Sequence, residues 1–420
     1  MIAMVGIIFW IASFWLNHST IQERKSLLQK AKENIVLSWS GSQNLLGPLL
    51  IVPYIDHSKN EKSAESYLIF FPKKLKGAGE AFPEIRKRGI FEVLVYESKF
   101  NLDCEFAPCG DHKDPNKTFF WSQAKIVICL SDTRGLNAAS LKINGKEARV
   151  LAGSASLNKE YPGMHAAISV DPGQSLHIMA HINFRGSETL NIVPIAKKNQ
   201  MDLKANWGSP SFIGHFLPTK REITDTSFHA NWEILSLATS LPEYLDHKDL
   251  ESSSHGDNWK YKILSKAVGI QFLDVVDHYK QAERTTKYSF LFVLYTFLLF
   301  FLFEVIKKTK LHIFQYCITA CSFLCFSLLL TAFAEHISFN VSYWVAAALI
   351  VSQITFYFSD LIKKQQERMI FSSFLLILYT YLFIVMRLEE FALLVGSIGM
   401  FAMISVAMLL TKKIDWFAEE

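Results

Sequence analysis

The sequence lacks the features of several common functional classes. Its net charge is only +4 over 420 residues, and its Lys and Arg residues stand in short clusters beside apolar runs. Such clusters are typical of membrane orientation signals and not of a surface that binds nucleic acid. The chain also contains no His-Glu-x-x-His zinc motif and no Gly-rich phosphate loop. We therefore expect no nucleic-acid partner, no metal and no cofactor.

Signals for catalysis are equally sparse. Ser122 and Ser156 each begin a Ser-x-x-Lys motif, which penicillin-recognising enzymes use, but no Lys-Thr-Gly accompanies either motif. His177 and His181 have the spacing of a zinc-binding pair on a helix. Their neighbours are typical of a strand, in which the two Cα atoms would lie ~13 Å apart. We predict no catalytic residue, and an enzyme stays an alternative only if one of these serines lies beside a base.

Cysteines are few, and no two form a Cys-x-x-Cys pair. Cys104, Cys109 and Cys129 lie in a polar stretch, where the first two could form a disulfide if that stretch is exported. Because three is an odd count, the sequence leaves both the disulfide and the free thiols open. The other three repeat every four residues inside an apolar run, a pattern that predicts one packing stripe along a helix; they are Cys317, Cys321 and Cys325.

Long apolar runs dominate the chain instead. Half of its residues are hydrophobic and 34 are Phe, a composition too apolar for a soluble protein of this length. A hydrocarbon core of ~30 Å requires about 20 apolar helical residues. Six segments meet or approach this length, and the chain is therefore predicted to be an integral membrane protein with one N-terminal and about five C-terminal helices: 2–16, 288–306, 312–333, 339–358, 369–386 and 391–410.

The first apolar segment, 2–16, is interpreted as a retained anchor. It lacks a basic leader, and residues 13–16 do not offer the small side chains that a signal peptidase requires.

Loop charges predict the orientation of these helices, because Lys and Arg near membrane ends stay in the cytoplasm. Alternate short loops carry eight basic residues, whereas the loops between them carry only Arg387. We therefore expect both termini in the cytoplasm and residues 17–287 outside it. Arg24 and Lys25 are basic residues on the exported side of the first helix and therefore oppose this orientation. Long loops, however, are exported largely regardless of charge. The eight basic residues are Lys307, Lys308, Lys310, Lys363, Lys364, Arg368, Lys412 and Lys413.

The exported stretch has the period-two pattern of strands. Asn144-Gly145 predicts a tight hairpin turn, and so many short strands favour a β-rich, sandwich-like domain. Residues 21–39 have helical spacing and are expected to form a stalk, whereas 243–287 are more polar and lead back to the membrane. The predicted domains are 1–16, 17–287, 288–411 and a cytoplasmic tail, 412–420. Predicted strands are 49–55, 67–71, 91–96, 126–130 and 177–184.

Ionisable residues near the membrane are candidate functional residues, because their burial in lipid is costly. Glu304 lies near the cytoplasmic end of its predicted helix, and Glu335 and His336 lie at the outer end of the next. At these depths, interfacial capping is at least as good an interpretation as ion or proton handling.

The segment 207–218 is a second candidate. It combines aromatic residues with Pro and Gly, which suits either a rigid contact surface or a packed turn against the sheet. The candidates there are Trp207, Phe212, Gly214, Phe216 and Pro218.

Several stretches in order resemble the CreD family of bacterial inner-membrane proteins. The most specific is Pro-Ser-Phe-Ile-Gly-His-Phe-Leu-Pro at 210–218. The resemblance implies a protein of Gram-negative bacteria whose induction accompanies a two-component system and whose presence affects envelope integrity and tolerance of envelope-directed agents; it implies no known chemistry. The other stretches are 47–53, 131–135, 206–207, 221–222, 231–232, 283–288, 303–304, 311–316, 335–336 and 414–416.

From these observations we expect a non-enzymatic inner-membrane protein that binds or senses envelope components through a periplasmic domain. Its expected partners are membrane lipids and envelope proteins or cell-wall components. The main alternative is a transporter or lipid-handling protein in which the C-terminal helices form a path. Five nearly unbroken helices fit that alternative poorly, because transporters often contain broken helices near the centre of the membrane.

Overall fold

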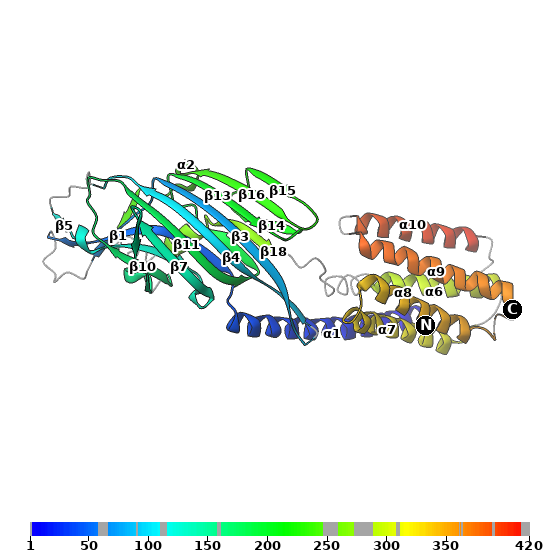
Figure 1. Ribbon diagram of the computed structural model, residues 1–420. Coiled ribbons are helices and arrows are strands. Elements are labelled where there is room, and N and C mark those ends of the chain that lie inside the picture. The colour runs from blue at the N-terminus through cyan, green and yellow to red at the C-terminus, as the bar shows by residue number, and fades with distance from the viewer. Residues whose placement is uncertain are drawn as a thin grey trace. The chain divides into compact units, whose positions relative to one another are not determined.

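The protein was analysed as a computed structural model (Figure 1), which describes residues 2–57, 66–89, 91–109, 116–157, 161–246, 259–272, 289–307, 311–360, 362, 364–388 and 391–412. The described residues fall into two compact units. One unit comprises Met1–Gln29 with Val276–Glu420, and the other comprises Lys30–Val275. Each unit is described by itself.

The unit Lys30–Val275 is built on two large β-sheets. The first has ten strands, with β1 at its centre, where β1 pairs antiparallel with β6 and parallel with β12. Along the sheet the order is β14 (Pro210–Gly214), β18 (Val268–Phe272), β12 (Thr189–Ile192), β1 (Gln43–Asp56), β6 (Ala124–Leu130), β10 (Gly163–Ile168) and β9 (Leu151–Ala152), with β2 (Ser66–Phe70), β5 (Lys117–Phe119) and β17 (Tyr244–Asp246) attached.

The second sheet has eight strands and is antiparallel except between β3 and β13. Its order is β15 (Lys220–Ile223), β16 (Phe228–Leu235), β13 (Lys198–Ala205), β3 (Lys74–Arg88), β4 (Phe91–Phe106), β11 (Leu176–Ser187), β7 (Leu136–Ile143) and β8 (Lys146–Ala148). Short helical turns complete this unit: η1 (Trp121–Gln123), η2 (Thr133–Gly135), η3 (Ala155–Leu157), α2 (Ser236–Thr239) and α4 (Trp259–Leu264).

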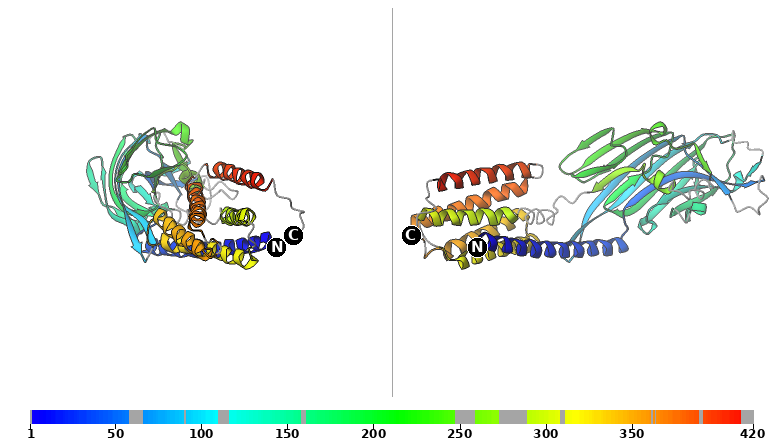
Figure 2. Two further views of the ribbon diagram at one scale, coloured as in Figure 1. Left: turned by 90° about the vertical axis from the view of Figure 1, so that its right-hand side faces the viewer. Right: turned by 180° about the vertical axis from the view of Figure 1, so that it is seen from behind.

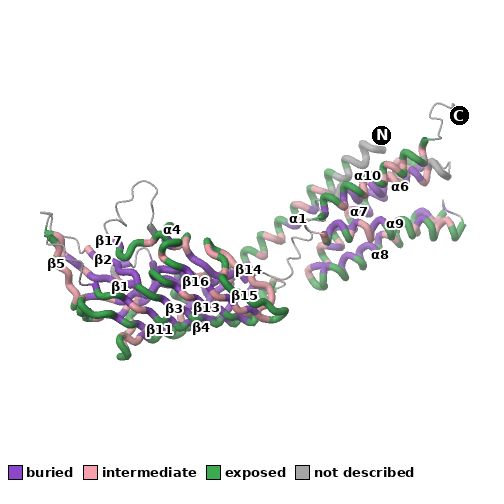
Figure 3. Tube along the Cα trace, turned by 90° about the horizontal axis from the view of Figure 1, so that it is seen from above, coloured by how far each residue is buried: buried purple, intermediate pink, exposed green. Residues whose placement is uncertain are grey.

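The two sheets pack face to face around one apolar core (Figures 1 and 2). Ring contacts join them directly, since Tyr96 of β4 lies 5.2 Å from Phe272 of β18 and Phe212 of β14 lies 6.0 Å from Trp232 of β16, between ring centres. Along β11, β13 and the first part of β3, buried residues alternate with more exposed ones (Figure 3), as expected where one face of a sheet covers a core and the other meets solvent. The predicted β-rich, sandwich-like fold is therefore confirmed.

A single helix, α1 (Ile2–Ser38), contains both the anchor and the stalk expected from the sequence. The polar residues between those two segments do not interrupt it. The hydroxyls of Ser19 and Thr20 both donate to the carbonyl of Leu16 at 2.9 Å, a bond that a helix accommodates.

The end of α1 is fastened to the β-sandwich by a network of hydrogen bonds between polar groups. Arg134 donates from Nη1 to the carbonyl of Leu37 at 3.0 Å, which satisfies an end carbonyl of the helix. Asp132 accepts from the backbone N–H of Gly41. Gln43, fully buried, donates to Ser40 Oγ and to the carbonyl of Asp132. The first residues of β1 are thereby fixed to the loop that contains η2.

The other unit contains the helices of the C-terminal half. Four of the helices described there are long and apolar enough to cross a membrane: α7 (Ile313–Ala334), α8 (Phe339–Tyr357), α9 (Gln365–Arg387) and α10 (Ala392–Thr411). The apolar α6 (Ser289–Lys307) joins them. Rings of Phe292, Phe326 and Tyr379, each at most 2% exposed, pack together at the centre of this unit. The predicted C-terminal helix cluster is therefore present.

The strand predictions agree with the structure where they were made. The segments 49–55, 67–71, 91–96, 126–130 and 177–184 lie in or overlap strands β1, β2, β4, β6 and β11. Asn144 and Gly145 form the predicted turn, with positive φ angles of 47° and 81°. In the stretch 243–287 the structure adds β17, α4 and β18, which the sequence did not reveal. Residues 247–258 and 273–287 of that stretch lie outside the described residues.

Candidate functional site

The outer face of the eight-stranded sheet gathers polar side chains from six strands. Because side chains alternate along a strand, residues in register on neighbouring strands form rows across this face. One row contains Lys220, Asn231, Asp202, Ala78, Asn101 and His181. The adjacent row contains Glu233, Gln200, Lys76, Asp103 and Met179.

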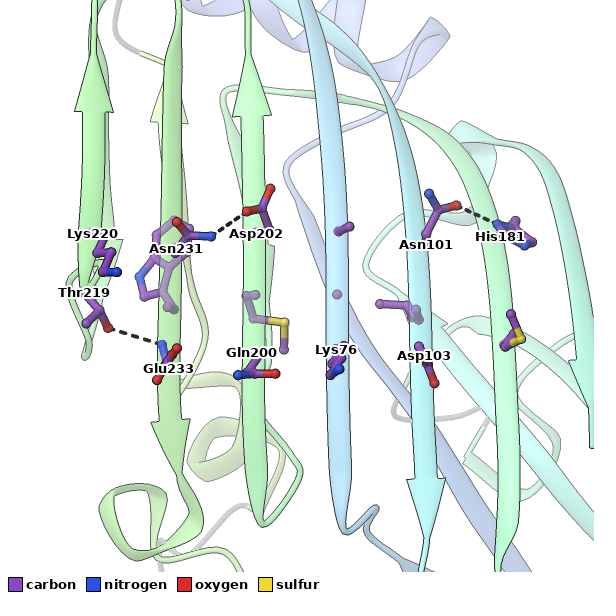
Figure 4. A pocket seen from close by; sticks show the side chains of 16 residues that line it. Lys76, Asn101, Asp103, His181, Gln200, Asp202, Thr219, Lys220, Asn231 and Glu233 are labelled. Carbon is purple, nitrogen blue, oxygen red and sulfur yellow. Dashed lines mark hydrogen bonds between the residues drawn. The ribbon is translucent and has the colours of Figure 1, made fainter.

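These two rows surround a hollow of about 510 Å³, which we call the outer-face hollow (Figure 4). Its centre is low because Ala78, on β3, carries only a methyl group between the longer side chains of β13 and β4. Glycine also shapes the strand beneath it. A Cβ at Gly79 would lie 2.3 Å from the Phe100 ring, so that ring can lie flat under β3 only because position 79 has no side chain.

Hydrogen bonds fix the side chains on both sides of the hollow. His181 Nδ1 lies 2.6 Å from Asn101 Oδ1, so the imidazole donates and the amide oxygen accepts. On the other side, Asp202 Oδ2 accepts from Asn231 Nδ2 and from His229 Nε2. Asn101 and Asp202 both line the hollow, and within the described part of the chain these bonds leave the Asn101 amide nitrogen and Asp202 Oδ1 without a hydrogen bond. The site thus offers an oriented donor on one side and an oriented acceptor on the other.

The charges around the hollow nearly cancel. Lys76 and Lys220 supply two positive charges, and Asp103, Asp202 and Glu233 supply three negative ones. Such a mixture does not favour a strongly charged ligand of either sign. Among the described residues, no group of three His, Cys, Asp or Glu side chains is placed to hold a metal ion.

The predicted candidates in 207–218 are packed against the sandwich. The Trp207 ring meets Phe272 edge-on at 6.4 Å, and Phe212 contacts Phe228 as well as Trp232. Gly214 has φ +105°, and a Cβ there would lie 2.1 Å from the carbonyl oxygen of Ala267.

The end of the same segment leads into the outer-face hollow. The carbonyl of Phe216 accepts a hydrogen bond of 3.1 Å from Trp232 Nε1. The half-buried Pro218 is followed directly by Thr219 and Lys220, which line the hollow. The segment therefore holds the outermost wall of the hollow in place.

The membrane-helix candidates lie at opposite ends of the helix cluster and are not brought together. Glu304 accepts from the hydroxyl of Tyr316 at 2.8 Å and from the backbone N–H of Leu311 at 3.3 Å, so it connects the end of α6 with the start of α7. Glu335, at the far end of α7, pairs with Arg24 at 3.2 Å. His336, next to it, is exposed.

The remaining sequence candidates are dispersed. Ser122 is exposed in η1, a turn that leads into β6 and not into a helix. Ser156 lies in η3, and its side chain is outside the described residues. His177 and His181 both lie on the outer face of β11, where His177 donates to Asp103 at 2.7 Å and His181 bonds Asn101. Their separate partners leave no shared ligand position.

Cys104 and Cys109 are free and buried in the structure. Desolvation raises the pKa of the Cys109 thiol to about 11 and that of the Cys104 thiol well above its usual value.

The hollow itself was missed in the sequence. Its strands do show alternating polar residues, for example 101 and 103 on β4 and 200 and 202 on β13. That pattern marks a solvent-facing side but does not reveal which strands are neighbours, so it could not bring the residues into one site.

Comparison with known proteins gives a consistent result. The sequence model of the family described as Inner membrane protein CreD matches residues 1–417. The Inner membrane protein CreD of Escherichia coli (strain K12) is 29% identical over 98% of this chain and 92% of its own length. Among solved structures, Legionella pneumophila aminopeptidase A in complex with aspartic acid is 10% identical and matches 43% of this chain and 21% of its own, with a TM-score of 0.19. A similarity at that score supports no argument about fold or function.

Proposed function

The chain belongs to the CreD family of inner membrane proteins, and from this premise we propose that it supports cell-envelope integrity and stress tolerance without catalysing a reaction. In this proposal the β domain binds or senses envelope components, and the membrane helices hold it at the inner membrane. The observation that carries the proposal is the outer-face hollow, which is lined mostly by polar residues of six strands and left uncovered by the described residues of its unit.

The proposed orientation places the β domain in the periplasm and both chain termini in the cytoplasm. The eight-to-one distribution of basic residues between alternate loops supports this arrangement. In it, the β domain faces the compartment that contains wall and outer-envelope material, which a binding role requires.

A binding role is supported more strongly than catalysis by the chemistry of the hollow. Two of its three carboxylates accept hydrogen bonds from neighbouring imidazoles, Asp202 from His229 and Asp103 from His177. Such bonds orient polar groups for recognition. A nucleophile would instead need a general base within hydrogen-bond reach, and the exposed Ser122 lies in a turn that opens a strand.

A matched pair of bulky substitutions tests the proposal. Ala78→Trp fills the centre of the hollow from an exposed position. Ala138→Trp adds the same side chain to the same sheet face, at an exposed position of β7 outside the hollow. Each variant replaces the chromosomal copy in the native host, and survival of envelope-directed agents is measured at equal membrane levels.

We expect Ala78→Trp to lower tolerance to the level of a deletion strain and Ala138→Trp to preserve it. Ser122→Ala and Ser156→Ala should also preserve tolerance. Full tolerance with Ala78→Trp would show that the hollow is not needed for the proposed function. Loss of tolerance with either serine variant, at normal folding, would favour an enzyme.

A further inference from the structure

The ligand of the outer-face hollow can be narrowed by its chemistry. We propose that the hollow binds a segment of neutral glycan, namely a β-1,4-linked chain of N-acetylated amino sugars such as the cell wall contains. This inference rests on the proposed function, in which the β domain meets envelope components.

Recognition in the hollow depends on side chains alone. Strand β3, which crosses its floor, is paired along residues 74–81 with β13 on one side and with β4 on the other. Its backbone N–H and C=O groups are therefore used within the sheet. An extended peptide that binds by adding a strand needs a free sheet edge, which β3 does not offer, so the floor of the hollow favours a ligand that presents its own donors and acceptors to side chains.

Charge and hydrogen-bonding capacity favour hydroxyl groups. Two lysines and three carboxylates leave the hollow close to neutral, which disfavours phosphate-rich or polyanionic ligands. The free groups are of both kinds, since the Asn101 amide nitrogen donates and Asp202 Oδ1 accepts, and Gln200 can do both. A sugar hydroxyl also donates and accepts, so it can pair with either kind.

Small apolar groups beside these polar ones favour an acetamido substituent. Met179 lies in register with Asp103, and Ala78 lies in register with Asn101. An acetamido group carries a methyl, an N–H and a carbonyl, which can meet an apolar side chain, a carboxylate and an amide nitrogen respectively. The hollow contains this combination of groups across three adjacent strands.

Its size also fits a short sugar segment. The volume of about 510 Å³ falls within the roughly 300–1,000 Å³ typical of small-ligand sites. The hollow is not enclosed but opens on the outer face of the sheet, so a longer chain can continue beyond it.

Isothermal titration calorimetry on the full chain in lipid nanodiscs tests the inference, with chitotetraose as the probe. We expect saturable binding by the unsubstituted protein and by Ala138→Trp. Binding should be at least ~10-fold weaker in Ala78→Trp, and similarly in Asn101→Ala, which loses the oriented donor without adding bulk. If Ala78→Trp does not fold, Asn101→Ala still tests whether the hollow binds the glycan.

Two further ligands sharpen the test. Cellotetraose, which lacks the acetamido groups, should bind about tenfold more weakly than chitotetraose, and equal affinity would overturn the assignment to amino sugars. A wall-type stem peptide should not compete, and its displacement of chitotetraose would point to a peptide site instead. Absence of chitotetraose binding, or binding that neither Ala78→Trp nor Asn101→Ala weakens, would overturn the glycan inference.

The outcome separates this inference from the proposed function. If Ala78→Trp abolishes envelope tolerance but chitotetraose does not bind, the hollow has a function and the glycan assignment is wrong. If Ala78→Trp preserves tolerance, the proposed function itself fails, whatever the calorimetry shows.

Discussion

The guanidinium carbon of Arg86 lies 3.6 Å from the centre of the Trp39 ring. Trp39 is the residue that directly follows α1, and Arg86 lies on β3 of the eight-stranded sheet. A second guanidinium, that of Arg185 on β11, lies 4.4 Å from the same ring centre. The end of α1 is therefore attached through one indole to two strands of the sheet that forms the hollow, by cation–π contacts that strengthen where water is excluded.

Trp39→Ala should destabilise the β domain by about 1–3 kcal/mol, because both cation–π contacts and the packing of the ring are lost. Trp39→Phe should lose less stability than Trp39→Ala, because phenylalanine keeps a ring at this position, although the quadrupole of that ring is weaker. Thermal unfolding of the detergent-solubilised protein, followed by the β-sheet circular dichroism signal, measures the effect. Trp15→Ala is the matched control, since Trp15 lies on the same helix and is 67% exposed. Equal melting of the Trp39 and Trp15 variants would show that the indole does not fix the helix end.

Asp132 predicts an acid dependence of stability. Hydrogen bonds from Arg134 and from the backbone N–H of Gly41 lower the pKa of its carboxyl from 3.8 to about 2. The folded pKa lies below the unfolded one, so the stabilisation is complete above pH 3.8 and is lost as pH falls towards 2.

We therefore expect the free energy of unfolding of the unsubstituted protein to exceed that of Asp132→Asn by a constant amount near neutral pH. The difference should shrink through this acid window. Urea unfolding at several pH values measures it. A difference that stays constant down to pH 2 would mean that the carboxylate charge contributes nothing.

The buried thiols make a prediction about chemical reactivity. The thiolate is the reactive form of cysteine, and burial raises the pKa of the Cys109 thiol to about 11 and of the Cys129 thiol to about 12. Iodoacetamide at neutral pH should label Cys104, Cys109 and Cys129 slowly in the native protein and rapidly after denaturation, without prior reduction. Peptide mass spectrometry reports each site. A disulfide-linked peptide containing Cys104 and Cys109 from unreduced protein would contradict the free-thiol state.

Within the membrane unit, Asn17 and Ser327 form a buried hydrogen bond of 2.7 Å. Asn17 is only 2% exposed, and a side-chain hydrogen bond between membrane helices contributes about 0.6–2 kcal/mol. Asn17→Ala and Ser327→Ala should each lower the stability of the helix cluster by a similar amount. In the double variant the losses should not add, because either substitution removes the same bond. Thermal unfolding in detergent measures the cycle, and additive losses would argue against a direct contact between the two side chains.

The sequence predicted local structure better than it predicted the site. Runs of β-branched and aromatic residues identified the segments 91–96 and 177–184 as strands, because such side chains favour strands whatever the neighbouring strand. The hollow depends on register instead. Ala78, Asn101 and His181 come together only because β3, β4 and β11 are neighbours, and a parallel pairing of β3 with β13 adds Asp202. No local pattern specifies that order. The candidates in 207–218 were found by composition, and only the three-dimensional contacts distinguish packing from exposure.

The last prediction concerns whether the segment 207–218 acts as a contact surface or as a packed support. The Phe212 ring lies 5.9 Å from that of Phe228 and 6.0 Å from that of Trp232, in two T-shaped pairs, which is the arrangement of a packed aromatic cluster. Gly214 lies against the backbone of Ala267 with no space for a Cβ.

We therefore expect Phe212→Ala to destabilise the β domain by about 2–4 kcal/mol and to lower envelope tolerance in parallel. Gly214→Ala should be at least as harmful, because a positive φ and a steric clash coincide there. Leu217→Ala is the control within the same segment, since Leu217 is 67% exposed, and it should leave both melting and tolerance nearly unchanged. Melting temperature and tolerance are measured on the same set of variants. If Phe212→Ala or Leu217→Ala abolished tolerance without a change in melting, the segment would be a contact surface. If melting and tolerance fall together, and only in the variants of packed positions, the segment is the support that holds Thr219 and Lys220 at the edge of the hollow.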